Sequence, residues 1–240
     1  MFPYDPLLST TVASTPQSIT DVLRALEAIQ TICEDGDGLK WFNWLYLQVT
    51  LAVKKRVDSG GLTDPVWLTK LDVQFASLYL NALESSLLGN KTPDCWQTLF
   101  TSRNQTRVAR IQFAMAGINA HITHDLPEAI VATSEATGTV PTQGIPEFQD
   151  YTSLNSTLEG IVESAKKTLH VRLLGDALPP VSHLQDLLAG WGVSAARDAA
   201  WNNAELLWNL RQSPPLSDAF MGTLDGLTTV TNKALLVPVP

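Results

Sequence analysis

The chain of 240 residues is poor in cysteine, in charge and in long apolar runs, and each shortage excludes a class of protein. Cys33 and Cys95 match no spacing of a metal site or redox motif, so we expect two free, buried thiols in a reducing compartment. Charged residues make up 17% of the chain against 45% hydrophobic ones, which excludes a disordered protein or a charge-rich coiled coil. Because no run reaches about 18 apolar residues, we expect no membrane span.

Positive charge is also scarce. With 16 basic and 24 acidic residues the net charge is −8, which argues against binding of a nucleic-acid backbone. The N-terminal stretch MFPYDPLLSTTVASTP has no basic residue and two early prolines, unlike a secretory signal. We therefore expect a soluble, cytoplasmic protein with no nucleic-acid partner. The sequence leaves a homodimer open.

The periodicity of apolar residues is helical in nearly every segment, and no run alternates as a strand would. It predicts an all-α, single-domain bundle of about eight to nine helices with partly orthogonal packing. The domain is expected over 18–240, after an extended arm over 1–17. The individual helices are expected over 18–35, 39–57, 64–89, 92–102, 106–124, 125–134, 146–170, 182–190, 194–212 and 216–236.

Several catalytic motifs are missing. There is no glycine-rich phosphate loop, no GxSxG elbow, no CxxC, no DDxxD helix of terpene cyclases and no pair of ExxH helices as in di-iron bundles. These absences disfavour phosphate, thiol and di-iron chemistry.

The densest group of polar residues is NAHITHD, which starts at Asn119 and ends at Asp125. On a helix, His121 lies one turn from both His124 and Asp125 and shares a face with them. His121, His124 and Asp125 could hold a divalent metal. Alternatively, His121 is a general acid or base whose tautomer Asp125 fixes, with Asn119 binding a substrate oxygen.

A purely structural interpretation of the same segment stays open. Asp125-Leu126-Pro127-Glu128 has the spacing of a capping box, which would start a new helix at Asp125. A histidine beside an apolar ridge is often a satisfied core residue. The pattern also lacks the glutamate of the HExxH zinc motif.

Further polar residues fall on apolar helix faces. Asp72 interrupts the apolar face of the helix over 64–89, where a carboxylate needs a partner or a purpose, and it is a candidate second catalytic carboxylate. Asn155 and Arg197 lie on the apolar faces of the helices over 146–170 and 194–212. Arg197 is the natural cationic partner of Asp72 or Asp125, which would favour structure as readily as catalysis.

Aromatic residues gather near these positions. The chain has seven tryptophans. Trp41 and Trp44 lie on a helix that is apolar nearly all round, which predicts a central helix or, alternatively, the wall of a pocket. Tyr79 shares the apolar face of its helix with Asp72. We therefore treat Trp41, Trp44 and Tyr79, with Asn119, Asn155 and Arg197, as candidate substrate-binding residues.

Five blocks resemble a family of helical domains of unknown function seen in actinobacteria and fungi. They are FNWLYLQVT, DPVWLTKLDVQFASLYLNAL, IQFAMAGINAHITHDLP, FQDYTSLN and ARDAAWNNAELLW, and NAHITHDLP is the most specific. The resemblance implies an all-helical fold in which Asp72, Asn119, His121, His124, Asp125, Asn155 and Arg197 belong to the family pattern. It implies no activity.

Together these features predict an enzyme that acts on a small, largely apolar molecule such as a natural-product intermediate. Cyclisation, isomerisation or elimination in an aromatic pocket would suit a site without an obvious nucleophile, with His121, Asp125 and Asp72 as catalytic residues. One alternative is a metal-dependent hydrolase that uses His121, His124 and either Asp125 or Asp72. Another is a non-catalytic binding protein whose buried polar residues form an Asp72–Arg197 network and a helix cap.

Overall fold

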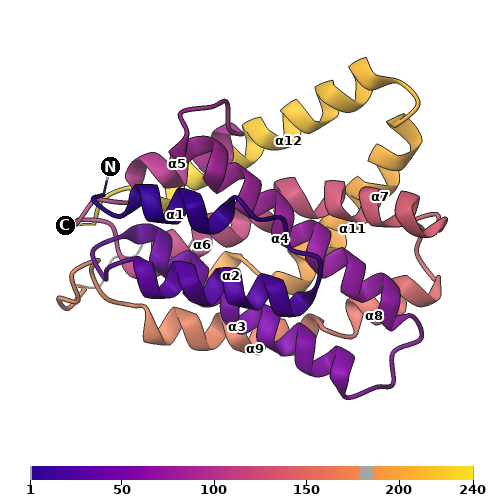
Figure 1. Ribbon diagram of the computed structural model, residues 1–240, viewed down its shortest axis with the longest axis horizontal. Coiled ribbons are helices and arrows are strands. Elements are labelled where there is room, and N and C mark those ends of the chain that lie inside the picture. The colour runs from indigo at the N-terminus through magenta and orange to yellow at the C-terminus, as the bar shows by residue number, and fades with distance from the viewer. Residues whose placement is uncertain (1, 179–185, 187, 240) are drawn as a thin grey trace.

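The computed structural model describes residues 2–178, 186 and 188–239, and it confirms the all-α prediction (Figure 1). In this part of the chain, backbone pairing of the β type is limited to isolated bridges. The helices are α1 (Asp5–Val12), α2 (Ile19–Ile32), α3 (Gly38–Asp58), α4 (Pro65–Leu87), α5 (Asp94–Ser102), α6 (Arg110–Ala120), the π-helical turn η1 (His121–Asp125), α7 (Leu126–Thr137), α8 (Pro146–Thr152), α9 (Asn155–Thr168), α11 (Val193–Leu210) and α12 (Pro214–Leu235). The helix expected over 182–190 falls mostly outside the described residues.

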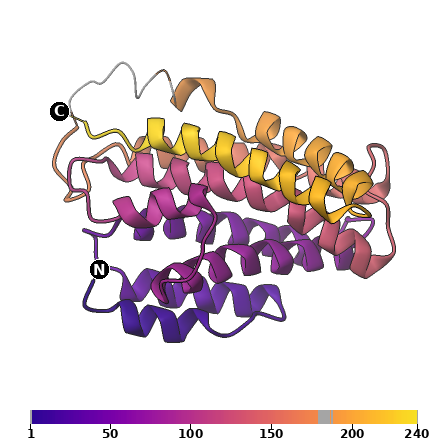
Figure 2. The same ribbon diagram turned by 90° about the horizontal axis from the view of Figure 1, so that it is seen from above.

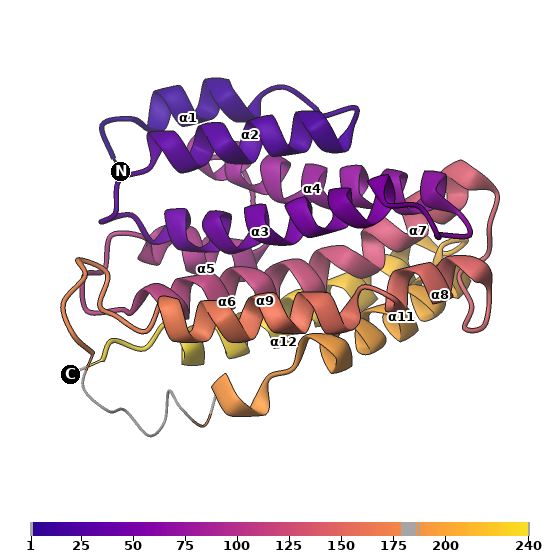
Figure 3. The same cartoon turned by 90° about the horizontal axis from the view of Figure 1, so that it is seen from below.

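The helices form layers that follow the order of the chain (Figures 2 and 3). Helices α1 and α2 cover one side of α3 and α4, α6 and α7 occupy the middle, and α11 and α12 cover the opposite side. The middle layer is therefore enclosed on both sides, and the segment that contains the two neighbouring histidines lies within it. Within the described residues, no helix combines the length and the apolar composition needed to cross a membrane.

Several helix starts follow directly from side-chain caps. The side chain of Ser18 accepts a hydrogen bond from the backbone of Asp21, and Asp64 does the same for Trp67 at the start of α4. Both residues stand where the sequence predicted a helix start. These caps satisfy backbone N–H groups that the first turn leaves without partners.

The extended N-terminal arm is a wrong prediction. Residues 5–12 form α1, which packs against α2 and α4 and buries Leu8 and Val12. Asp5 accepts a hydrogen bond from the backbone N–H of Phe2 at 2.7 Å, and Pro6 follows in the first turn. Proline at that position suits a helix start, because the missing N–H has no helical partner there.

The boundary at Asp125 is wrong as well. Instead of two helices, α6, η1 and α7 form one continuous rod from Arg110 to Thr137, and the side chain of Asp125 makes no capping bond. Pro127 lacks the N–H that an α-helix would use, and the wider π turn just before it accommodates that loss. The proline therefore marks a π turn within a helix. The segment predicted as one helix over 146–170 is in turn divided into α8 and α9.

Close packing of α3 and α6 depends on Gly117. A Cβ atom at Gly117 would overlap the ring of Phe42, which is fully buried. Glycine thus lets the two helices approach closely. Phe42 in turn contacts the rings of Tyr79, Trp96 and His121, so this approach helps to set the surroundings of the histidine.

Candidate functional site

One buried carboxylate holds two histidines. Oδ2 of Asp125 lies 2.9 Å from Nδ1 of His121, and Oδ1 lies 2.7 Å from Nδ1 of His124. Trp96 donates a third hydrogen bond from its indole N–H to Oδ2 at 3.0 Å. All three ring systems are buried, and Asp125 itself is 2% exposed. The carboxylate is therefore the centre of the site.

The chemistry of Asp125 determines the tautomer of both histidines. An ionised carboxylate only accepts hydrogen bonds, so each Nδ1 carries the proton that it donates. The hydrogen bonds from the two histidines hold the pKa of Asp125 below its ordinary value, although burial alone would raise it. Nε2 of each neutral ring then has a free lone pair. Nε2 of His121 is buried and has no hydrogen-bond partner.

Aromatic rings enclose His121. The ring of Phe75 stacks on it with centroids 3.4 Å apart and planes inclined by 7°. Tyr46 meets the imidazole edge-on, with centroids 4.6 Å apart. The rings of Phe42, Tyr79 and Trp96 complete the enclosure. Burial lowers the pKa of His121, and the hydrogen bond to Asp125 opposes this only in part, which favours the neutral base.

Two small cavities adjoin this enclosure. One, of about 40 Å³, is lined by Asp72, and the other, of about 30 Å³, is lined by His121. Tyr46, Phe75 and Arg197 line both cavities, together with Val49 and Leu158. An ordered water occupies about 30 Å³, so in this conformation each cavity has room for little more than a water molecule. A larger ligand would need Phe75, which is only partly buried, to move aside.

Asp72 faces its cavity as an isolated acid. Its side chain is buried, and Oδ2 has no hydrogen-bond partner. Burial raises the pKa of Asp72 to about 7, so the carboxyl group is partly protonated at neutral pH. The charge of Asp72 is one reason why the pKa of Tyr46 lies above its ordinary value, after burial itself. The tyrosine hydroxyl therefore lies within the field of this carboxylate.

Comparison with known proteins identifies the family. The model of a family of unknown function, DUF5995, matches residues 19–238. The chain belongs to the DUF5995 family. The match confirms the predicted resemblance to a helical family of unknown function. No curated protein and no solved structure matches the chain.

The matched region of this DUF5995 chain begins at the first residue of α2 and extends past the end of α12. Every residue of the site described above therefore lies inside the family domain. Helix α1, by contrast, precedes it. This placement concerns the fold, because the family description carries no activity.

The predicted ion pair of Arg197 with Asp72 or Asp125 is wrong. Arg197 donates from Nε to Oδ1 of Asn155 at 2.7 Å and from Nη2 to the carbonyl oxygen of Tyr151 at 2.8 Å. The guanidinium also lies over the ring of Tyr151, 3.8 Å from its centroid. These contacts direct the cation toward α8 and α9. Arg197, which lines both cavities, is thus joined to Asn155, which lines neither, and Asp72 has no described cationic partner.

Of the six predicted substrate-binding residues, all within the described part of the chain, Arg197 alone lines the two cavities described above, and three of the others lie elsewhere. Among the described residues, Trp41, Trp44 and Asn119 line neither cavity. Helix α3 directs Phe42, Tyr46 and Val49 inward, a spacing of one helical turn that leaves Trp41 and Trp44 on other faces.

The hydrogen bonds of Trp41 and Asn119 explain their positions. The indole N–H of Trp41 donates to the carbonyl oxygen of Asp35 at 3.1 Å. The amide of Asn119 donates to Oδ1 of Asn232 on α12 at 2.9 Å. Both residues are therefore held by polar partners outside the cavities.

Tyr79 is close to the site only through its ring. The ring packs against His121, with centroids 6.1 Å apart. Burial raises the pKa of Tyr79, and the neighbouring thiol of Cys33 and carboxylate of Asp37 raise it further. Tyr79 is part of the wall. The cysteines are free and buried, as predicted.

The predicted metal ligands do not form a metal-binding group in the described structure. Nδ1 of His121 and Nδ1 of His124 both donate to Asp125, whose oxygens are thereby used. A different group of metal-binding side chains occurs, formed by Cys95, His124 and Asp225. Sequence reasoning missed Cys95 and Asp225, because they lie on α5 and α12, far from His124 along the chain. No spacing within one helix could have revealed them.

Proposed function

We propose that this protein is an enzyme that transfers protons on a small, largely apolar molecule, with His121 as the general base. The observation that carries the proposal is the hydrogen bonding of the two ring nitrogens of His121. Asp125 holds Nδ1 at 2.9 Å, while Nε2 is buried without a partner beside a cavity. A buried acceptor left unpaired costs stability, about 1–3 kcal/mol, unless a ligand uses it.

Asp72 is the matching acid in this proposal. It lines the neighbouring cavity, and its raised pKa of about 7 keeps a proton available near neutral pH. When two groups have different surroundings, one can be a neutral base and the other a protonated acid. The base can then remove a proton from one atom of the substrate while the acid donates a proton to another. Isomerisation, cyclisation and elimination all need that pair of steps.

The lining of the cavities supports a largely apolar substrate. Apart from Tyr46, Asp72, His121 and Arg197, the described lining residues are hydrophobic. None of the described lining residues is a serine, threonine, cysteine or lysine, so a covalent intermediate on such a side chain is not part of the proposal. Arg197 lines both cavities and is placed to hold a polar end of the substrate, and Asn155 holds its guanidinium at 2.7 Å.

A purely structural role for these polar residues has less support. The structural role predicted from the sequence was an ion pair between Asp72 and Arg197 and a helix cap by Asp125, and neither contact occurs in the described structure. Asp72 Oδ2 and His121 Nε2 instead stay without partners. Their cost to folding is easier to understand if they serve a ligand.

Deuterium uptake tests the proposal even while the substrate is unidentified. The protein would be incubated in D₂O with a low-molecular-weight extract of the cells that make it, and mass spectrometry would follow protein-dependent labelling or consumption of a compound. We expect H121Q to lose this activity by about 100-fold or more, as is usual for removal of a general base. H170Q is the matched control, because His170 lines neither cavity and should leave the rate unchanged.

A folded H121Q protein, verified by its thermal melt, that labels the same compound at the wild-type rate would disprove the role of His121. If the wild-type protein neither labels nor consumes any compound in the extract, the proposed chemistry is disproved.

A further inference from the structure

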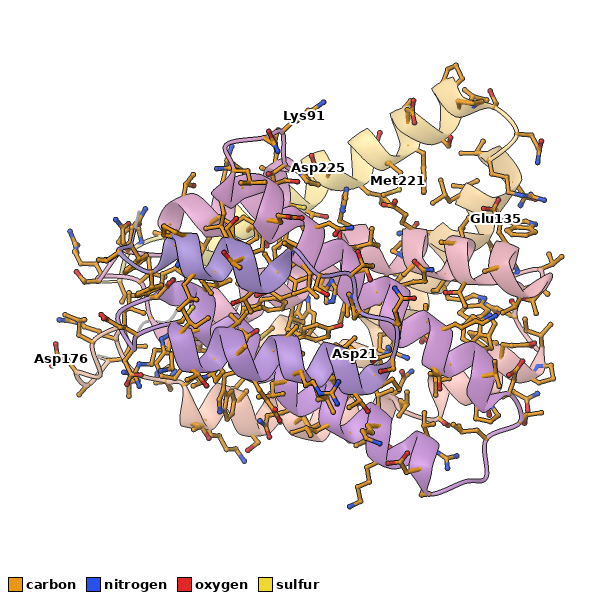
Figure 4. The ribbon with its side chains drawn as sticks, viewed as in Figure 1. Asp21, Lys91, Glu135, Asp176, Met221 and Asp225 are labelled. Atoms are coloured by element: carbon orange, nitrogen blue, oxygen red, sulfur yellow. The ribbon has the colours of Figure 1, made fainter. Side chains whose placement is uncertain are left out.

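A second polar group lies on the other side of Asp125 from His121. Cys95 on α5, His124 in the π turn and Asp225 on α12 each offer a ligand atom, and these atoms all lie within 4.8 Å of one another. Figure 4 shows Asp225 on α12 beside the loop with Lys91 that leads into α5. Three helices thus bring together a sulfur, a nitrogen and an oxygen donor.

His124 is held as metal-binding histidines usually are. Its Nδ1 donates to Oδ1 of Asp125 at 2.7 Å, which leaves Nε2 as the atom that can coordinate. A carboxylate behind the imidazole fixes the ring orientation and makes the free nitrogen a better ligand. Asp125 therefore serves His124 as it serves His121.

Two side chains of α12 hold the backbone of Cys95 in place. Asp225 accepts the N–H of Cys95 at 2.8 Å and the N–H of Asp94 at 3.0 Å. Asn232, two turns further along α12, donates to the carbonyl oxygen of Cys95 at 3.1 Å, and Asn119 donates to Asn232. The cysteine and the aspartate are therefore held in a defined relation. The oxygens of Asp225 keep lone pairs beyond those used by the backbone.

The group is accessible and negatively charged. Cys95 is fully buried and His124 is 8% exposed, while Asp225 is half-buried and opens the group to solvent. Two carboxylates surround the group, since Asp225 belongs to it and Asp125 lies behind His124. Among the described residues, no lysine or arginine forms an ion pair with Asp225. Such a negative region attracts a cation.

We propose that Cys95, His124 and Asp225 bind a divalent transition metal, with Zn²⁺ as the best match. A mixed set of thiolate, imidazole and carboxylate ligands suits zinc, and three protein ligands leave a fourth tetrahedral position open. Ligand atoms around tetrahedral zinc lie roughly 3.5 Å apart, so binding requires small side-chain rotations from the present spacing. The site shares Asp125 with the His121 centre but does not depend on the function proposed for it.

Metal content and titration test the site. Protein stripped with a chelator would be titrated with ZnCl₂ by calorimetry, and the bound metal would be counted by elemental analysis. We expect one equivalent in the wild type and at least a 100-fold weaker affinity in C95S and in D225N. The D225N variant keeps one oxygen that can accept a backbone N–H, so one of the two hydrogen bonds from Asp225 to the start of α5 can be retained. D125N should weaken binding by about 10- to 100-fold, as loss of a supporting carboxylate does.

Controls separate metal binding from folding and from the His121 chemistry. C33S removes the other buried thiol and should bind zinc like the wild type. H121Q should also keep the metal, even where it loses activity. Co²⁺ in the wild type should show a thiolate-to-metal charge-transfer band that C95S lacks. Absence of a bound equivalent in the wild type, or equal affinity in folded C95S, would overturn the proposal.

Discussion

The two histidines that share Asp125 occupy opposite environments. His121 is 1% exposed and lies among aromatic rings, with Phe75 stacked on its face. His124 is 8% exposed and lies among groups that bear or can bear negative charge, beside Cys95 and Asp225. Both donate Nδ1 to the same carboxylate, at 2.9 Å and 2.7 Å.

Their pKa values move in opposite directions. Burial lowers the pKa of His121 more than Asp125 raises it. Burial also acts on His124, but the hydrogen bond to Asp125 and the charges of Asp125, Asp225 and Glu128 together raise its pKa. Identical side chains with the same partner therefore acquire different chemistry from what surrounds them. Their positions are why we assign proton transfer to one and metal binding to the other: His121 lines a cavity with an unpaired Nε2, and His124 lies beside Cys95 and Asp225.

The largest effect should come from removing the shared carboxylate. D125A leaves the N–H groups of His121, His124 and Trp96 buried without an acceptor. We expect a loss of about 3–5 kcal/mol in the free energy of unfolding, measured by urea denaturation. D58A is the control, because the exposed pair of Asp58 with Lys54 should contribute less than about 1 kcal/mol. A D125A protein as stable as D58A would show that the two histidines do not depend on Asp125.

The free energy of unfolding should depend on pH through Asp72, which lies on the His121 side of the site and not on the His124 side. Burial raises the pKa of Asp72 from 3.8 to about 7, so the folded protein holds this proton more tightly than the unfolded chain. Stability is therefore lost as the pH rises from about 4 to about 7, and the full loss is present above pH 7. The difference between 3.8 and about 7 corresponds to about 4 kcal/mol, an upper limit because the chain can relax.

D72N should remove this loss. We expect the variant to match the wild type near pH 4 and to be more stable by roughly 2–4 kcal/mol at pH 8, measured by urea unfolding across that range. Zinc affinity, which belongs to the His124 side, should not change. Parallel stability curves for the two proteins would contradict the isolated position of Asp72.

The smallest effect concerns the wall of the His121 enclosure. The hydroxyl of Tyr79 is buried without a hydrogen-bond partner, so Y79F should change the free energy of unfolding by less than about 1 kcal/mol, toward greater stability. Y151F is the matched control. The hydroxyl of Tyr151 donates to the carbonyl oxygen of Arg197 at 2.8 Å, and its loss should cost about 1 kcal/mol. If thermal melts show that Y79F and Y151F lose the same amount of stability, the Tyr79 hydroxyl has a hydrogen-bond partner.

Short-range features of the site were predictable. His121 and Asp125 lie four residues apart, and this spacing alone brings their side chains together on one turn. The position of Asp72 on an apolar face likewise predicted its burial, which the structure confirms at 6% exposure. Such predictions succeed because helical geometry relates neighbours along the chain by a constant rotation and rise.

Features that depend on contacts between helices were not predictable. Arg197 could reach several partners, and the positions of α8 and α9 decide that it binds Tyr151 and Asn155. The tryptophans of α3 are large and apolar, yet the rotation of the helix against α6 directs Phe42 and Tyr46 toward His121 instead. A flexible side chain or a helix apolar nearly all round has no preferred side until its neighbours are in place.

The few charged residues inside this protein were predictable from the sequence, but their partners were decided by the tertiary structure. By itself the sequence determined an all-α fold, the approximate helix ranges, and the presence of a carboxylate and two histidines within the apolar core, because local periodicity and composition control these. Only the tertiary structure decided that Asp125 is shared, that His121 faces an aromatic enclosure, and that Cys95 and Asp225 meet His124. Those arrangements depend on the packing of helices distant in the chain, and side-chain spacing along one helix carries no information about it.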